Sequence, residues 1–165
     1  MSKEQCAFAQ KEPKSSEFAG NSGFAAIYNI APIVPGHSLV IPRRHIKRIN
    51  ELSEDEFGRY WLFARDITNF LLHAFKTDAF DWIVQEQKAA GQTVPHLHLH
   101  IIPRVAEDFV DPGDWYPRLS QGRIVDPAHE VVNSNDRVRL SIDEHKRITS
   151  ELANQWQMWN MSDTR

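Results

Sequence analysis

The stretch TVPHLHLHIIPR, Thr93 to Arg104, places three of the chain's eight histidines at strict two-residue spacing. Side chains alternate between the two faces of a β-strand. His96, His98 and His100 are therefore expected on one face, with the intervening aliphatic residues on the other. The aliphatic face predicts burial in a core, which leaves a row of imidazoles on the opposite face of the strand.

A metal site is one interpretation of this row, since His-x-His is a common ligand spacing. A strand rise of about 3.3 Å per residue separates the backbones of His96 and His100 by roughly 13 Å, whereas Zn–N bonds measure about 2.0–2.1 Å. His37 or Asp108 would have to supply a further ligand, and nothing in the sequence singles out either of them. A half-exposed strand whose histidines have no function is a second interpretation. We predict no metal site.

Covalent catalysis is the interpretation that the residue types favour. A neutral imidazole nitrogen is a good nucleophile near pH 7, and flanking rings can donate protons or hydrogen bonds to an anionic substrate. The adjacent turn AGQTV offers backbone N–H groups, the Gln92 amide and the Thr93 hydroxyl, and its glycine lets the backbone approach a ligand closely. The pattern predicts phosphoryl or nucleotidyl transfer.

The composition is that of one soluble globular domain. The chain has 165 residues, of which 41% are hydrophobic and 25% charged, and its net charge of −3 argues against nucleic-acid binding. Cys6 is the only cysteine, so an internal disulfide or a thiolate metal cluster is excluded. No stretch has the continuous apolar character of a signal peptide or a membrane span. A cytoplasmic location without membrane contact is therefore expected.

Hydrophobic periodicity and turn residues predict four strands and two helices. Strands are expected over residues 23–30, 37–42 and 80–87 and over the histidine segment. Helices are expected over residues 53–75 and 141–160, each opened by a Ser-x-x-Glu capping box. The apolar face expected for the first helix consists of Phe57, Trp61, Ala64, Ile67, Thr68 and Leu71.

This order of elements predicts a single α+β domain over residues 1–165, with an antiparallel sheet, the long helix packed on one face, and a C-terminal helix. The domain divides into a polar N-terminal segment over residues 1–20, a core over residues 24–109, and a loop followed by the C-terminal helix over residues 110–165.

The histidine segment resembles the His-φ-His-φ-His-φ-φ signature (φ apolar) of the histidine triad (HIT) superfamily of nucleotide hydrolases and transferases. The resemblance runs from about Phe24 to Phe109, through YNIAPIVPGHSLVIP and AGQTVPHLHLHIIPR to AEDF. The last two runs are similar to the Fhit branch, the dinucleoside polyphosphate hydrolases. The Hint branch usually carries Cys-x-x-Cys near its N-terminus, where CAFA keeps only Cys6, so its zinc site is not expected.

The resemblance implies a HIT-like fold, a homodimer, and a nucleotide substrate that is cleaved at its α-phosphate. His98 would be the nucleophile that forms a nucleotidyl-histidine, His96 and His100 would flank it and contact phosphate or leaving group, and His37 would buttress the triad by hydrogen bonding. The residues implied in substrate binding are Asn29 at the ribose and Gln85, Gln92 and Thr93 at the phosphates. No cofactor is expected at the chemical step; a divalent cation would serve only as a counter-ion of the substrate.

Several alternatives stay open at this point. A nucleoside phosphoramidate hydrolase, a nucleotidyltransferase and a non-catalytic nucleotide-binding protein share the fold. The run QEQKAAG departs from Fhit-like sequences, so the residues from Glu86 to Lys88 leave the preference for polyphosphate length undecided. In DPGDWYPR, Trp115 and Tyr116 would stack a base and Arg118 would meet phosphate, or the segment is a loop without function. His45, in the basic connection, is expected to be a surface or capping residue, and His73, His129 and His145 are expected at the surface.

Overall fold

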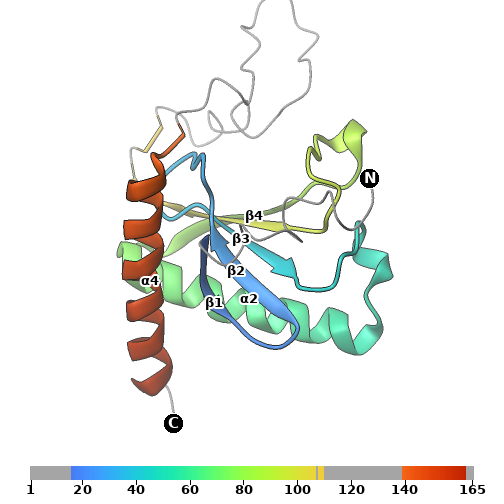
Figure 1. Ribbon diagram of the computed structural model, residues 1–165, viewed down its shortest axis with the longest axis horizontal. Helices are drawn as coiled ribbons and strands as arrows, with labels where there is room; N and C mark the ends of the chain where they lie inside the picture. Colours follow the sequence, from blue (N-terminus) through green and yellow to red (C-terminus); the bar gives the residue numbers. More distant parts are fainter. Residues whose placement is uncertain (1–15, 107, 110–138, 163–165) are drawn as a thin grey trace, which may run out of the picture.

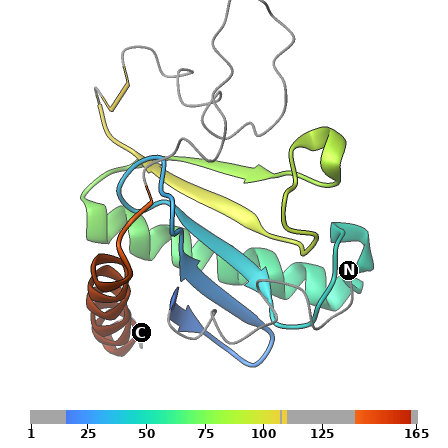
Figure 2. The same cartoon turned by 45° about the horizontal axis from the view of Figure 1, so that its top comes forward.

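The computed structural model describes residues 16–106, 108–109 and 139–162. Its centre is an antiparallel five-stranded sheet in the order β1-β2-β3-β5-β4, with helices packed against it (Figures 1 and 2). The strands are β1 (Glu17–Gly20), β2 (Phe24–Tyr28), β3 (Ser38–Pro42), β4 (Ala79–Val84) and β5 (Leu99–Arg104); the helices are α2 (Glu54–Phe75) and α4 (Ile142–Ser162), with short 3-10 turns η2 (Ile49–Glu51) and η3 (Lys88–Ala90). The predicted α+β class is confirmed.

Helix α2 lies along one face of the sheet (Figure 1) and begins with the predicted capping box. The Ser53 hydroxyl accepts from the Glu56 N–H at 3.2 Å, and the Glu56 carboxylate accepts from the Ser53 N–H at 2.9 Å. Each pairing satisfies an N–H at the helix start, where intrahelical partners are missing. Neither described helix is long and apolar enough to cross a membrane.

The buried stripe of α2 is centred on Tyr60, Ile67 and Leu71, all fully buried. The expected face was wrong at Phe57, which is 43% exposed. At about 100° per residue, Phe57 and Trp61 fall toward the edge of a stripe centred on these three residues. The sheet therefore covers them only in part, and their rings pack on each other at 5.9 Å.

The alternation predicted for the histidine segment is confirmed on its aliphatic side. Leu97, Leu99 and Ile101 are at most 1% exposed and belong to the core between the sheet and the helices. Strand β5 begins only at Leu99, however, so the predicted strand was too long at its start. Proline has no N–H to donate to a ladder, and after Pro95 the His96 N–H instead donates to the Val94 carbonyl at 2.8 Å.

Strand β1 was missed by the sequence prediction, which treated residues 1–20 as a polar segment. It pairs with β2 and contacts helix α4, and its residues Phe18 and Ala19 are buried. Four residues with two apolar side chains show no recognisable period, so only the tertiary contacts reveal the strand.

The expectation that His145 lies at the surface was also wrong. The side chain is 5% exposed, in α4 where that helix crosses β1 and β2. Its Nε2–H donates to the Tyr28 carbonyl at 3.0 Å. A backbone carbonyl satisfies the imidazole, which allows a polar residue to be buried at this contact.

Candidate active site

The pairing of β3 with β5 brings the histidine segment next to the PGH turn. Leu39 lies opposite His100 in the sheet, so His37, just before β3, is placed beside the His100 ring. The Nε2 of His37 is 2.9 Å from the Nδ1 of His100, and the His98 and His100 rings are 5.0 Å apart at their centroids. Three of the four histidines predicted to be catalytic therefore form one contiguous cluster.

The tautomer of His98 follows from its contact with the backbone. Its Nδ1 lies 2.8 Å from the carbonyl oxygen of His96, which can only accept. Nδ1 therefore carries the proton, and the lone pair of the neutral ring is on Nε2. Burial lowers the pKa of His98, which keeps the ring neutral near pH 7. A buried, neutral imidazole with its lone pair on Nε2 has the form that a nucleophile requires.

The tautomer of His37 and His100 can be deduced in the same way. The Ile33 N–H donates to His37 Nδ1 at 3.1 Å, so the proton of a neutral His37 is on Nε2. That proton points to His100 Nδ1, which accepts it. The His100 proton is then on Nε2. Because His37 is fully buried, this chain of donors is held away from solvent.

His96 contacts protein groups through both ring nitrogens. Its Nε2–H donates to the Pro42 carbonyl at 2.8 Å, and its Nδ1 is 3.3 Å from the Nδ1 of His45. The ring is fully buried, and burial lowers its pKa to about 4. In this structure His96 supports the site from within the protein, and its contact with phosphate stays a prediction.

The loop from Gln85 to Gln92 contacts the histidine segment through Gln92. The Gln92 side chain accepts from the Gln87 N–H at 2.8 Å and donates to the His96 carbonyl at 3.1 Å. Gly91 has φ +94, and a Cβ there would lie 2.8 Å from the Gln85 amide nitrogen. Glycine thus permits both the backbone conformation and the close approach of Gln85.

The structure places the other two predicted substrate-binding residues differently. Thr93 is exposed in the turn before the triad. Asn29 is half-buried, its side-chain carbonyl accepts from the Ala31 N–H at 2.9 Å, and its amide nitrogen is 3.3 Å from His37 Nε2. The structure therefore places Asn29 against the histidine cluster.

Sequence reasoning missed His45, which was expected to be a surface or capping residue. It is half-buried, and its ring meets His96 edge-on with centroids 5.2 Å apart. Nothing in the local sequence links the two residues, because they are 51 positions apart. The proposed roles of Trp115, Tyr116 and Arg118, and the surface position of His129, lie outside the described residues.

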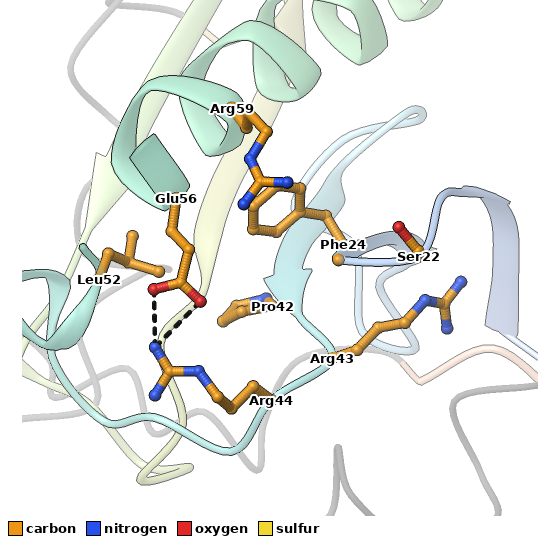
Figure 3. Close-up of a pocket in the computed structure, with 9 residues that line it drawn as sticks. Ser22, Phe24, Pro42, Arg43, Arg44, Leu52, Glu56 and Arg59 are labelled. Carbon is orange, nitrogen blue, oxygen red and sulfur yellow. Dashed lines mark hydrogen bonds and ion pairs between the residues drawn. The ribbon is translucent and has the colours of Figure 1, made fainter. Parts of the chain in front are cut away.

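A separate pocket lies near the start of α2 (Figure 3) and contains none of the triad histidines. Its volume is about 210 Å³. The residues that line it are Ser22, Gly23, Phe24, Pro42, Arg43, Arg44, Leu52, Glu56 and Arg59. Within the part of the chain that the structure describes, no group of three or more His, Cys, Asp or Glu side chains is arranged to hold a metal ion.

Comparison with known proteins identifies the family. The family model described as "HIT domain" matches residues 10–107. The chain belongs to the HIT domain family. This HIT protein is 35% identical to a bis(5'-adenosyl)-triphosphatase of Dictyostelium discoideum, over 75% of its own length and 83% of the relative's. It is 32% identical to the bifunctional bis(5'-adenosyl)-triphosphatase/adenylylsulfatase FHIT of Arabidopsis thaliana, over 81% and 73% of the two chains.

A solved structure supports the same fold. The HIT protein superimposes on the diadenosine triphosphate hydrolase of Plasmodium falciparum, solved with cyclomarin A, with a TM-score of 0.67. The two chains are 23% identical, and the match covers 88% of this chain and 78% of the other. The HIT-like fold inferred from the sequence is confirmed.

Proposed function

We propose that this HIT protein hydrolyses a dinucleoside polyphosphate, such as diadenosine tri- or tetraphosphate, at its α-phosphate and releases a nucleoside monophosphate. The observation that carries the proposal is the His98 ring, which the His96 carbonyl holds with its lone pair on Nε2. The relatives named bis(5'-adenosyl)-triphosphatase support the substrate class.

In the first step, Nε2 of His98 attacks the α-phosphorus. The P–N bond forms, and the bond from phosphorus to the bridging oxygen breaks. The leaving nucleoside phosphate departs as an anion, and the Nε2–H of His100 donates a hydrogen bond to its developing charge. The His98 Nδ1–H stays on the His96 carbonyl, so the positive charge of the nucleotidyl-histidine is also stabilised there.

In the second step, water attacks the α-phosphorus of the nucleotidyl-histidine. The P–O bond forms, the P–N bond breaks, and the electron pair returns to Nε2 of His98. One proton of the water passes to solvent as the nucleoside monophosphate forms. The enzyme regains its starting tautomer without redistributing protons inside the cluster.

Substitution of His98 tests the proposed activity. Wild-type protein should release AMP from diadenosine triphosphate, and His98→Ala should lose more than about a hundredfold in kcat, because removal of a nucleophile costs more than removal of one acid or base. His73→Asn changes a histidine on the exposed side of α2 and serves as the matched control. If the wild-type protein does not hydrolyse diadenosine triphosphate but does hydrolyse adenosine phosphoramidate, its activity is that of a phosphoramidate hydrolase instead. An AMP group passed to an added acceptor in preference to water would assign transferase activity.

We propose the substrate-binding residues from the family resemblance, together with the contacts of Asn29 and Gln92 with the histidine segment. Asn29, beside His37, would meet the ribose; Gln85 and Thr93 would meet the phosphates. Gln92 would contact a phosphate after giving up its hydrogen bond to the Gln87 N–H or to the His96 carbonyl. Asn29→Ala and Thr93→Ala should raise KM for the dinucleotide more than they lower kcat, whereas equal losses in kcat and kcat/KM would place their contacts in the transition state alone.

We also propose that the protein is a homodimer. Within the described residues β4 pairs only with β5 and forms an edge of the sheet, and the backbone N–H and C=O groups of an edge strand are a template for pairing with another chain. Phe80 on this strand is 42% exposed. Sedimentation equilibrium should give twice the chain mass, and Phe80→Glu should shift the protein toward monomer; a wild-type monomer at all concentrations would overturn the proposal.

A cofactor-free chemical step and a cytoplasmic location complete the proposal. The hydrogen bonds of His96 and His37 occupy both ring nitrogens of each residue, so a metal ligated there would have to break them. Activity should survive dialysis against EDTA, with an added divalent cation changing only substrate affinity; activity lost with stoichiometric zinc and restored by it would contradict this. Fluorescence of a tagged chain in its own cells tests the location.

A further inference from the structure

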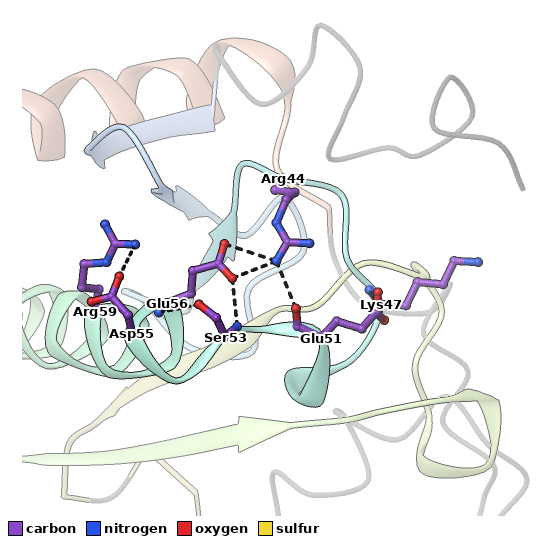
Figure 4. Close-up of polar contacts among 7 residues, drawn as sticks. All are labelled: Arg44, Lys47, Glu51, Ser53, Asp55, Glu56 and Arg59. Carbon is purple, nitrogen blue, oxygen red and sulfur yellow. Dashed lines mark hydrogen bonds and ion pairs between the residues drawn. The ribbon is translucent and has the colours of Figure 1, made fainter.

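His45 follows β3 on a connection that is tied to the rest of the protein. Its neighbour Arg44 contacts the Glu56 carboxylate at 2.9 Å and the Glu51 carbonyl at 3.0 Å (Figure 4). The Glu51 carboxylate accepts from the backbone N–H groups of Lys47 and Arg48 at 3.1 and 2.9 Å. These contacts restrain the Arg44 side chain before His45 and the backbone of Lys47 and Arg48 after it, so the His45 ring is presented to His96 from a preorganised segment.

The direction of the hydrogen bond between His45 and His96 is set by Pro42. The Pro42 carbonyl can only accept, so His96 carries its proton on Nε2. A neutral His96 then has its lone pair on Nδ1. The Nδ1 of His45, 3.3 Å away, must be the donor.

The backbone of His96 connects this contact to the nucleophile. The His96 carbonyl accepts from the His98 Nδ1–H at 2.8 Å and from the Gln92 side chain at 3.1 Å. Next to it, the Leu97 N–H donates to the Ile46 carbonyl at 2.7 Å. Residues 45 and 46 thus hold residues 96 and 97 by one ring contact and one backbone contact.

We propose that His45 is a positioning residue for the nucleotidyl transfer: by donating to His96 Nδ1 it holds the His96 ring, and with it the carbonyl that keeps His98 protonated on Nδ1. The inference rests on the proposed function for its catalytic consequence alone. Without this donor, the buried Nδ1 of His96 would lose the hydrogen bond from His45, and the ring would gain by turning to reach another donor, which breaks its bond to Pro42. Movement of the carbonyl would let His98 adopt the Nε2–H tautomer, which cannot attack phosphorus.

Two substitutions of nearly equal shape separate hydrogen bonding from packing. His45→Asn keeps an N–H donor near the position of Nδ1, whereas His45→Leu has the same branching without a donor. His45→Asn should stay within about threefold of wild-type kcat, and His45→Leu should lose about tenfold or more in kcat with KM changed less than about twofold. His45→Asp is a polar, donor-free replacement, suited to this half-exposed position if the leucine variant fails to fold.

Nitrogen-15 NMR of the histidine rings in the ligand-free protein reports the tautomer of His98. A merely structural role of His45 would leave this tautomer unchanged. Wild type and His45→Asn should show His98 with one protonated Nδ1 and one lone-pair Nε2. His45→Leu and His45→Asp should show an exchange-averaged or reversed pair of signals. Because this measurement needs no substrate, it decides the role of His45 even if no dinucleotide is hydrolysed. An unchanged His98 tautomer in the donor-free variants, or equal losses of kcat in His45→Asn and His45→Leu, would overturn the proposal.

Discussion

The Nδ1–H of His98 donates to the backbone carbonyl of His96, two residues earlier, at 2.8 Å. The first histidine of the triad therefore orients the second through its main chain, while its own ring is held by Pro42 and His45. The third histidine is oriented from the other side, by His37. The three rings share a regular spacing but have different hydrogen-bonding environments, and these environments suit them to different tasks.

Loss of His37 should impair catalysis and stability together. His37→Phe removes the acceptor of the Ile33 N–H and the donor to His100. We expect kcat to fall by about ten- to hundredfold, and the free energy of unfolding to fall by about 1–3 kcal/mol because a buried N–H loses its partner. His37→Gln can still donate to His100 and should keep more of its kcat. Steady-state kinetics measures the first effect and urea unfolding the second. A His37→Phe variant with wild-type kcat would exclude a catalytic role for the hydrogen bond from His37 to His100.

The dependence of activity on pH should report the neutral form of His98. Protonation removes the Nε2 lone pair, and burial lowers the pKa of this ring below its ordinary value of 6.5. The value of kcat/KM should therefore stay level down to pH 6.5 and fall only in more acidic solution. Circular dichroism at each pH separates titration from unfolding. A loss of kcat/KM centred above pH 6.5, in folded protein, would be incompatible with a buried neutral nucleophile.

Stability should also fall in acid because of His96. Burial lowers its pKa from 6.5 to about 4, so between these values the unfolded chain binds a proton that the folded chain does not. The contribution of His96 is fully present above pH 6.5 and is lost as the pH falls toward 4, by up to roughly 3 kcal/mol. Urea unfolding at pH 7 and pH 4.5 should show a smaller drop for His96→Asn than for wild type. Equal drops would mean that His96 is not desolvated in the folded protein.

Gln87 has an unfavourable backbone conformation in the loop beside the site. Its φ of 69° and ψ of 162° fall in a region that is essentially restricted to glycine. Gln87→Gly should raise the free energy of unfolding by about 1 kcal/mol, after the greater flexibility of the unfolded glycine chain is subtracted. Lys88→Gly, one residue later in η3, should not stabilise the protein. Thermal unfolding of both variants tests this; destabilisation by Gln87→Gly would show that the side chain contributes more than the backbone costs.

Periodicity was enough to predict the fold class, the two helices and the burial of Leu97, Leu99 and Ile101, because these features depend on side chains close together in sequence. The cluster of His37 and His100 was expected only through the family resemblance, since its members are 63 residues apart. The role of His45 and the burial of His145 depend on which backbone carbonyl or ring lies opposite each side chain. That information arises only when the strands pair and α4 packs.

The central claim is that His98 becomes covalently nucleotidylated through Nε2. Its most direct test is to mix the protein with diadenosine triphosphate, quench within milliseconds in alkaline denaturant, which preserves a phosphorus–nitrogen bond, and measure the mass of the intact chain and its peptides. We predict an added adenylyl group on the peptide that contains His98 in the wild type and in His73→Asn, and none in His98→Ala. Turnover without any such adduct, or an adduct that persists in His98→Ala, would contradict the account.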